Sequence, residues 1–176
     1  MLEKAIKFAS EAHRGHVRKV SGKPYILHPM EACVIVSNMT TDMELLAAAL
    51  LHDTIEDTSV TYEQIEAEFG KRVADLVQSE SEDKSKTWME RKQHTIDHIR
   101  EKSLEEKILI LGDKLSNIRS LNREFEKHGD IVWDFFKMKD KNMQGWYYKG
   151  VAEALTDLSK YPEYQEFIML CDKVFG

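Results

Sequence analysis

The stretch KILILGDKLSNIRSL, residues 107–121, decides between a helical and a β fold for this chain. Its first half is apolar enough to pass for a buried strand. The apolar positions nevertheless continue at steps of three and four, through Ile108, Leu111, Leu115, Ile118 and Leu121. That spacing lines one face of an α-helix. Ser103 and Glu106, just before the stretch, form a pattern that starts helices. We therefore predict a long helix here.

The same spacing recurs along nearly the whole chain, which has only three prolines and eight glycines. Two of the expected helices have only a predicted start, near residue 29 and at residue 42. The others cover residues 2–13, 61–70, 71–78, 87–102, 103–121, 145–158 and 163–175. The stretch SESEDKSK, residues 79–86, is expected to be an exposed loop. We predict an all-α fold: a single helical bundle of about eight to ten helices, forming one domain over residues 1–176.

Composition narrows the class of protein. The 176 residues are 42% hydrophobic and 32% charged, as is ordinary for a soluble globular chain. A net charge of -6 disfavours sequence-independent binding of nucleic acid. No apolar run approaches the roughly 18 residues that span a membrane, and the charged N-terminus is not a signal peptide. Two cysteines, expected to be buried thiols, fit a reducing compartment. We expect a cytoplasmic protein; its oligomeric state is not indicated.

The segment LLHDTIEDT, residues 50–58, joins a very apolar run to a cluster of polar groups. On a helix through residues 45–57, His52 and Glu56 lie one turn apart, as do Asp53 and Asp57, all within roughly 140° of arc. Carboxylates at the C-terminal end of a helix oppose its dipole, so a positive partner is expected. A divalent metal suits these ligand types. The alternative is a solvated acidic helix end with a chance histidine.

A metal site would need further ligands, and two residues elsewhere qualify. His28 precedes Pro29 at the start of an expected helix. Asp113 lies inside the apolar stretch, where an unpaired carboxylate would be costly to bury. The alternative for Asp113 is an ion pair with Lys114 or with an arginine of another helix. Asn117 lies one turn beyond Asp113, on the same helix face.

The order His28, His52-Asp53, Asp113 resembles the HD-domain metal-dependent phosphohydrolases. Within that superfamily the chain is most similar to the hydrolase domain of the RelA/SpoT proteins, and above all to the stand-alone small alarmone hydrolases, including the metazoan SpoT homologue. The matching segments are RKVSGKPYILHP (18–29), AAALLHDTIEDT (47–58), FGKRVADLV (69–77), ERKQH (90–94) and GDKLSNIRSL (112–121). They span most of the chain from about residue 5 to residue 125.

This resemblance implies an HD-domain bundle that hydrolyses guanosine 3′-diphosphate 5′-di- or triphosphate to GDP or GTP and pyrophosphate. The implied cofactor is manganese. The implied metal ligands are His28, His52, Asp53 and Asp113. The implied carboxylates that handle the attacking water are Glu56 and Asp57. The implied substrate-binding residues are Arg18, Lys19, Asn117 and Ser120.

The chemistry of these residues suits the roles that the resemblance implies. Glu56 can accept a proton from water, with Asp57 orienting it, but their spacing fits either order of roles. The anionic substrate needs a local basic patch, and the loop with Arg14, Arg18, Lys19 and Lys23 supplies one. The planar guanidinium of Arg18 can stack on a purine. The alternative for this loop is a solvated basic turn.

The chain also departs from its relatives. Residues 79–84, SESEDK, lack the threonine of a related Val-Thr-Asp-Asp-Lys-like block, and Gly112 stands where many relatives have alanine. Two rival functions follow: an HD phosphohydrolase for another nucleotide, such as a deoxynucleotide or NADPH phosphatase, and a non-catalytic alarmone-binding or antitoxin protein. The intact Glu56-Asp57 pair favours catalysis over the second rival.

Two further groups are interpreted as structural. His94 and His98 are one helical turn apart, but no glutamate follows His94 as in the H-E-x-x-H metal motif. We expect both on a helix surface. Six aromatic residues in the C-terminal third are expected mainly to pack the last helices, with a pocket wall as the alternative. They are Trp133, Phe135, Phe136, Trp146, Tyr147 and Tyr148.

Overall fold

The computed structural model describes residues 1–176, and its regular secondary structure is helical. Its only β feature is an isolated bridge between Val17 and Pro24. The α-helices are α1 (Leu2–Ala12), α2 (Leu27–Ser37), α3 (Met43–Leu51), α4 (Thr54–Asp57), α5 (Tyr62–Phe69), α6 (Lys71–Glu80), α7 (Trp88–Ile99), α8 (Leu104–His128), α9 (Lys141–Ala154) and α10 (Pro162–Phe175). Two 3-10 helices, η1 (Gly129–Phe135) and η2 (Thr156–Leu158), complete the chain. The predicted all-α bundle is confirmed.

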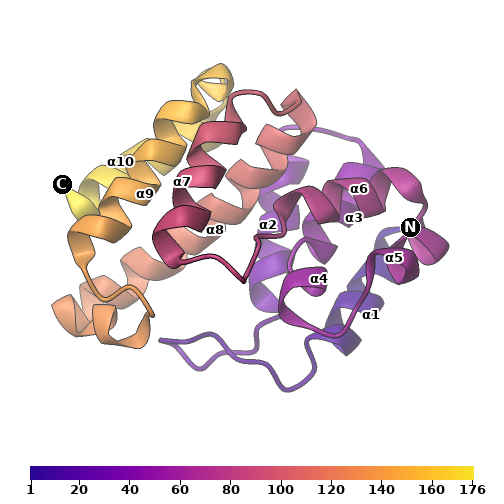
Figure 1. Cartoon of the computed structure of the whole chain (residues 1–176), viewed down its shortest axis with the longest axis horizontal. Coiled ribbons are helices and arrows are strands. Elements are labelled where there is room, and N and C mark those ends of the chain that lie inside the picture. Colours follow the sequence, from indigo (N-terminus) through magenta and orange to yellow (C-terminus); the bar gives the residue numbers. More distant parts are fainter.

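Helix α8 is the centre of the bundle. It begins at the predicted capping box, in which Ser103 accepts the N–H of Glu106 and Glu106 accepts the N–H of Ser103. Helices α2, α3, α6 and α10 all pack against it, and α9 and α7 extend the bundle on the α10 side (Figure 1). The apolar face of α8, including Leu111, Leu115 and Ile118, is fully buried. The stretch that passed for a strand is thus the core helix.

Helix α3 is the most enclosed helix, because every residue from Leu45 to Leu51 is buried. A helix that is apolar all round belongs inside a protein. Asp42 begins it as predicted, by accepting the N–H groups of Glu44 and Leu45. The end of α3 therefore delivers the next residues, His52 and Asp53, into the interior.

The predicted continuous helix over residues 45–57 is wrong. Helix α3 ends at Leu51, His52 and Asp53 form a turn, and the short helix α4 follows. The break has a local cause, because two side chains bond to carbonyls at the end of α3. The His52 imidazole Nδ1 lies 2.8 Å from the Ala49 carbonyl, and the Thr54 hydroxyl donates to the Leu51 carbonyl at 2.7 Å.

The predicted exposed loop over residues 79–86 is wrong in its first half. Helix α6 continues to Glu80, and the Glu82 side chain is only 13% exposed. Glu82 is held inward by ion pairs with Arg91 and Lys92 of α7. Residues 83–86 are exposed as expected. The helix predicted over residues 145–158 is split into α9 and η2.

Gly112 permits a close contact between α2 and α8. A Cβ atom at this position would lie 2.5 Å from Val36 Cγ2 and 3.2 Å from the Ala32 carbonyl oxygen. Only a residue without a side chain allows the two backbones to approach so closely. The departure from alanine at this position therefore reflects packing, in the same pair of helices that carries His28 and Asp113.

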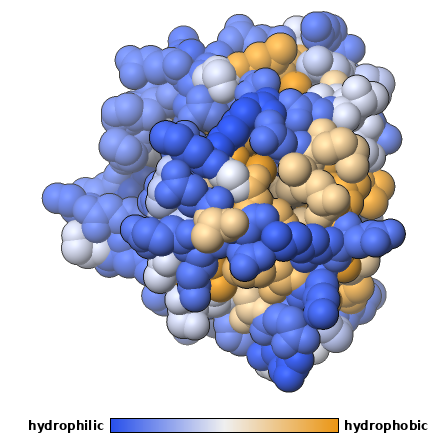
Figure 2. Space-filling model, turned by 90° about the vertical axis from the view of Figure 1, so that its right-hand side faces the viewer, coloured by the Kyte–Doolittle hydropathy of each residue, from blue (hydrophilic) through white to orange (hydrophobic).

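The surface is mainly hydrophilic on the face shown in Figure 2, where apolar side chains gather in one area. Some exposed apolar surface is ordinary for globular proteins. No helix has both the length and the apolar character to span a bilayer. Cys171 is buried, Cys33 is partly buried, and both are free thiols, as expected.

Candidate functional site

Four side chains converge in the interior where α2, α8 and the turn after α3 meet. His28 Nε2 lies 3.2 Å from His52 Nε2 and 3.2 Å from Asp113 Oδ1. Asp53 Oδ2 lies 3.1 Å from His52 Nε2 and 3.4 Å from His28 Nε2. His28, His52 and Asp113 are all buried. The four predicted metal ligands are therefore neighbours in space, although they come from three separate segments.

The hydrogen bonds on the far side of each imidazole fix its tautomer. His52 Nδ1 faces the Ala49 carbonyl, which can only accept, so Nδ1 carries the proton. His28 Nδ1 lies 2.9 Å from the Ser116 hydroxyl, and that hydroxyl donates its own proton to Glu31 at 2.8 Å. The Ser116 oxygen therefore accepts from His28 Nδ1–H. Both Nε2 atoms consequently present lone pairs to the centre of the cluster.

The centre of the cluster thus holds only acceptors: two imidazole nitrogens and two carboxylate oxygens. Such an arrangement needs a cation, and this mixture of ligands suits a divalent first-row ion. The charges of the two aspartates also favour a cation at this position. Although burial opposes it, Asp53 and Asp113 raise the pKa of His52 well above its ordinary value. The residues present therefore fit a divalent metal ion.

Asp113 is oriented by both of its oxygens. Asn117 donates to Oδ1 at 2.6 Å, and the Lys114 ammonium donates to Oδ2 at 2.7 Å. Burial opposes ionisation, but Lys114 and the two imidazoles hold the pKa of Asp113 well below its ordinary value. The ion pair with Lys114 that sequence offered as an alternative exists. It occupies the oxygen that faces away from His28, so the two interpretations are compatible.

Tyr25 is a site residue to which sequence reasoning assigned no role. Its hydroxyl lies 2.6 Å from Asp53 Oδ2 and 3.4 Å from Asp57 Oδ2, within reach of a metal-ligand candidate and a catalytic candidate. The available signal was its position three residues before His28. Tyr25 lies in the turn that leads into α2, in which the His28 N–H donates to the Tyr25 carbonyl, and the two rings lie 5.8 Å apart.

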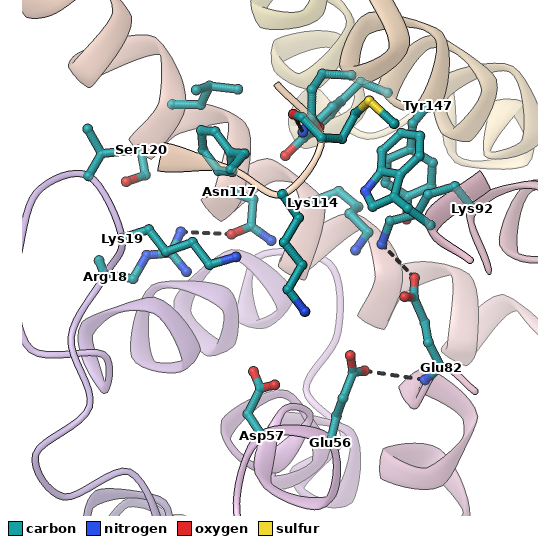
Figure 3. A pocket seen from close by; sticks show the side chains of 18 of the residues that line it. Arg18, Lys19, Glu56, Asp57, Glu82, Lys92, Lys114, Asn117, Ser120 and Tyr147 are labelled. Carbon is teal, nitrogen blue, oxygen red and sulfur yellow. Dashed lines mark hydrogen bonds and ion pairs between the residues drawn. The ribbon is translucent and has the colours of Figure 1, made fainter. Parts of the chain in front are cut away.

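A cavity of about 420 Å³ opens above this cluster. Its lining includes every other predicted site residue: Arg18, Lys19, Glu56, Asp57, Asn117 and Ser120. Three lining residues also contact the cluster, since Tyr25 bonds to Asp53 while Lys114 and Asn117 bond to Asp113. Figure 3 shows Arg18 and Lys19 on one side of the cavity, Lys114 at its centre, and Glu56 and Asp57 below.

Glu56 and Asp57 differ in their surroundings. Glu56 Oε2 accepts one weak bond, from the Glu82 backbone N–H at 3.3 Å. Burial and the nearby charge of Glu82 raise the pKa of Glu56 above its ordinary value. Asp57 is held by the Tyr25 hydroxyl and by the Lys84 ammonium, each at 3.3–3.4 Å. Glu56 thus has a raised affinity for a proton, whereas the Asp57 side chain has two hydrogen-bond partners.

The basic loop between α1 and α2 forms a small hairpin closed by the Val17–Pro24 bridge. Arg18 points into the cavity, where it donates to Asn117 Oδ1 at 2.8 Å and lies over the Tyr25 ring at 5.5 Å. The Lys19 ammonium lies 6.0 Å from the Phe136 ring. Arg14 instead pairs with Glu11 at the surface. Arg18 is therefore held in place as part of the cavity wall, whereas Arg14 is exposed to solvent.

The C-terminal aromatic residues divide between core and cavity. Phe136, Tyr147 and Tyr148 line the cavity, joined by Trp88 from α7. Trp133 packs in the core against Phe125 and Phe175. Phe135 is half-exposed. His94 and His98 stack on each other on the exposed side of α7, in keeping with the expected surface role.

Glu82 is a cavity residue that sequence reasoning placed in an exposed loop. Its carboxylate pairs with Arg91 and Lys92, and its backbone N–H reaches Glu56. The one signal in the sequence was the ERK segment of α7, whose cations need a partner. Nothing in the spacing of residues 79–86 indicates which carboxylate that partner is.

Comparisons with known proteins identify the family of this chain. Residues 5–137 match the HD domain family. The guanosine-3′,5′-bis(diphosphate) 3′-pyrophosphohydrolase MESH1 of Danio rerio is 43% identical over 126 residues, 70% of each chain. The crystal structure of lmo0812 from Listeria monocytogenes has a TM-score of 0.77 and 38% identity, covering 84% of this chain and 98% of that one. A metazoan ortholog of SpoT that hydrolyzes ppGpp has a TM-score of 0.77 and 27% identity, covering 98% and 92%. This chain belongs to the HD domain family.

Proposed function

We propose that this protein is a metal-dependent guanosine-3′,5′-bis(diphosphate) 3′-pyrophosphohydrolase, which converts ppGpp or pppGpp to GDP or GTP and pyrophosphate. The observation that carries the proposal is the convergence of four acceptor atoms beside a cavity that holds both carboxylates and cations. Relatives that are 41–43% identical over the aligned residues carry this activity in their names. A volume of about 420 Å³ lies within the range of small-ligand sites.

The proposed metal is Mn²⁺, held by His28, His52, Asp53 and Asp113. Bound there, a divalent ion lowers the pKa of water and polarises a phosphoryl oxygen. Tyr25 holds Asp53 in place through its hydroxyl, and Ser116 holds His28 in the tautomer that exposes Nε2. The protein thus fixes the position of these ligands before the metal arrives.

Glu56 is the proposed general base. Its raised pKa increases its affinity for the proton that water must lose, and it is only weakly bonded to other groups. Asp57 is the proposed orienting carboxylate, since Tyr25 and Lys84 hold it in place. The water oxygen attacks the phosphorus attached to the ribose 3′-oxygen. The P–O3′ bond breaks, pyrophosphate leaves with the water oxygen, and the 3′-oxygen is protonated to the hydroxyl of GDP.

The proposed nucleoside side of the cavity is the wall with Arg18, Lys19, Asn117 and Ser120. Asn117 Oδ1 holds the Arg18 guanidinium, which thereby presents a flat cationic surface for a purine. Lys19 adds positive charge beside it. We further propose that residues 1–176 form one domain and that the protein acts in the cytoplasm.

Product analysis tests the function directly. Purified protein is incubated with ppGpp and Mn²⁺, beside an EDTA control and a panel including deoxynucleotides and NADPH. Metal-dependent release of GDP and intact pyrophosphate from ppGpp is the expected result. Release of orthophosphate from another nucleotide, without turnover of ppGpp, would show that the protein is a phosphohydrolase with a different substrate. Tight binding of ppGpp without any turnover would make the protein a sensor or an antitoxin.

A further inference from the structure

The cavity carries a second group of cations, on the wall opposite the basic hairpin. Arg91 and Lys92 come from α7, and Lys114 reaches the centre of the cavity from α8. Figure 3 shows Lys92 and Tyr147 on the side away from Arg18 and Lys19. The metal-ligand cluster adjoins the cavity between these walls, because Lys114 bonds to Asp113.

Two of these cations, Arg91 and Lys92, are poorly hydrated and share one carboxylate. Glu82 accepts from Arg91 Nη1 at 2.8 Å and from Lys92 Nζ at 2.6 Å, and all three side chains are 13–17% exposed. Lys114 is 17% exposed and its only ion-pair partner is Asp113. Partial burial of charges is costly unless each is compensated. One Glu82 carboxylate cannot compensate two cations fully.

The cations at this wall repel one another. Burial and repulsion from Lys114 lower the pKa of Lys92, although Glu82 opposes the shift. Lys92 and Lys114 lie over the same Tyr147 ring, at 4.8 and 5.7 Å from its centre. The electron-rich face of that ring offsets part of the repulsion. An anion entering the cavity would offset the remainder.

Two unpaired donors lie at the same wall. The Tyr147 hydroxyl and Arg91 Nε are buried and have no hydrogen-bond partner within the chain, and Tyr147 as a whole is only 4% exposed. Buried donors in native proteins are nearly always paired. Both residues line the cavity. A ligand with several acceptor oxygens would satisfy them, and a phosphate group is such a ligand.

We infer that Arg91, Lys92 and Lys114 form a second anion subsite, which binds the 5′-diphosphate of the nucleotide. The inference rests on the proposed function. A ribose carries its base, its 3′-oxygen and its 5′-oxygen in three directions, and the cavity offers three matching regions. With the base at Arg18 and the 3′-diphosphate at the metal ligands, the 5′-diphosphate lies at the α7 wall. Glu82 is the counterion that holds Arg91 and Lys92 when no nucleotide is bound.

Binding of simple guanine ligands tests the subsite without any turnover. GDP, GMP and guanosine are titrated by calorimetry into Mn²⁺-loaded wild type and Lys92→Met, which removes the charge and keeps the chain length. The GDP affinity of Lys92→Met should fall about 10-fold or more, as for loss of a charged hydrogen bond. The affinity for guanosine should not change. Lys92→Arg should restore most of the GDP affinity.

One further variant serves as a control, and another is a second test. Arg100→Ala removes an exposed cation at the end of α7, which has no ion pair, and should leave all three affinities unchanged. Glu82→Gln frees Arg91 and Lys92, and should tighten GDP several-fold without affecting guanosine. Thermal unfolding of each variant verifies that it is folded. Equal changes for GDP and guanosine in Lys92→Met, or weaker GDP binding in Glu82→Gln, would overturn the subsite.

Measurements of turnover distinguish failure of the proposed subsite from failure of the proposed function. For Lys92→Met, the KM for ppGpp should rise far more than the KM for guanosine 5′-monophosphate 3′-diphosphate. If wild type does not hydrolyse ppGpp, the proposed function fails, while selective loss of GDP binding would still establish a nucleoside diphosphate subsite. If wild type hydrolyses ppGpp and Lys92→Met binds GDP normally, the function stands and the subsite is rejected.

Discussion

The Nε2 atoms of His28 and His52 lie 3.2 Å apart, and neither carries a proton to share with the other. Their protons are on Nδ1, where Ser116 and the Ala49 carbonyl accept them. Two facing lone pairs beside two carboxylates are stable only around a positive charge. This relationship favours a metal centre over a histidine–aspartate hydrogen-bond network.

Ser116→Ala tests the tautomer argument. Without the hydroxyl, His28 Nδ1–H loses its acceptor, and the imidazole can turn or place its proton on Nε2. Loss of such an outer partner typically costs 10- to 100-fold in metal affinity. We expect a decrease of about this size in Mn²⁺ affinity, measured by calorimetric titration. Ser37→Ala, an exposed serine at the end of α2, is the matched control. Unchanged affinity in Ser116→Ala would show that Ser116 does not determine the tautomer.

Glu56→Gln tests the general base. The amide cannot accept the proton, so kcat should fall by about 10²- to 10⁴-fold. Mn²⁺ affinity should stay within about twofold, because Glu56 is not a proposed ligand. Steady-state kinetics beside metal titration gives both numbers. Asp57→Asn provides the comparison: a larger loss of kcat there than in Glu56→Gln would exchange the two roles.

The pH dependence of kcat follows from the same carboxylate. Glu56 acts in its ionised form, and its pKa is raised by burial and by Glu82. Activity should therefore fall as the pH drops through a value above that of an ordinary glutamate. Glu82→Gln removes one cause of the shift and should move the acidic limb of the kcat profile to lower pH. A limb that does not move would assign it to another group, such as a metal ligand.

The helical pattern could be predicted from the sequence, because apolar spacing is a local property. The ten proposed site residues could be predicted because the order of the motifs resembles a known family. The turn at His52 and Asp53 could not, since it depends on side-chain bonds to the Ala49 and Leu51 carbonyls. The position of Glu82 could not be predicted from the sequence either. It is drawn into the cavity by cations about ten positions away on α7, and that contact requires the packed bundle.

Gly112→Ala tests the close contact of α2 and α8. The added methyl group would lie 2.5 Å from Val36 Cγ2. Overpacking of this kind costs about 1–3 kcal/mol, more than the gain of up to about 1 kcal/mol in helix propensity. Urea unfolding should show a net loss of stability and a coupling with Val36→Ala, which makes room for the methyl group. Strictly additive effects of the two substitutions would contradict the contact.

Glu80 should make folding stability depend on pH. Burial and the charge of Asp113 raise its pKa to about 7 in the folded protein. The folded state then binds more protons than the unfolded state between the ordinary glutamate pKa and about 7, so this group's contribution to stability falls as the pH rises through that interval. At pH 8, Glu80→Gln should be more stable than wild type by about 1–3 kcal/mol.

The difference between Glu80→Gln and wild type should disappear below pH 4.5, where Glu80 is protonated in both states. Denaturant unfolding across this range measures it. Glu153→Gln, at an exposed position of α9, should show no such dependence. A Glu80→Gln variant that is less stable than wild type at pH 8 would mean that Glu80 is ionised and paired in the folded protein.

The central claim is that a divalent metal held by His28, His52, Asp53 and Asp113 enables hydrolysis of ppGpp. The most direct measurement titrates metal-free protein with Mn²⁺ while following bound Mn²⁺ by electron paramagnetic resonance and pyrophosphate release from ppGpp in the same samples. We predict one tightly bound Mn²⁺ per chain and activity that rises in proportion to it, with both signals lost in Asp113→Ala. Full activity in the metal-free protein, or in Asp113→Ala, would contradict the account.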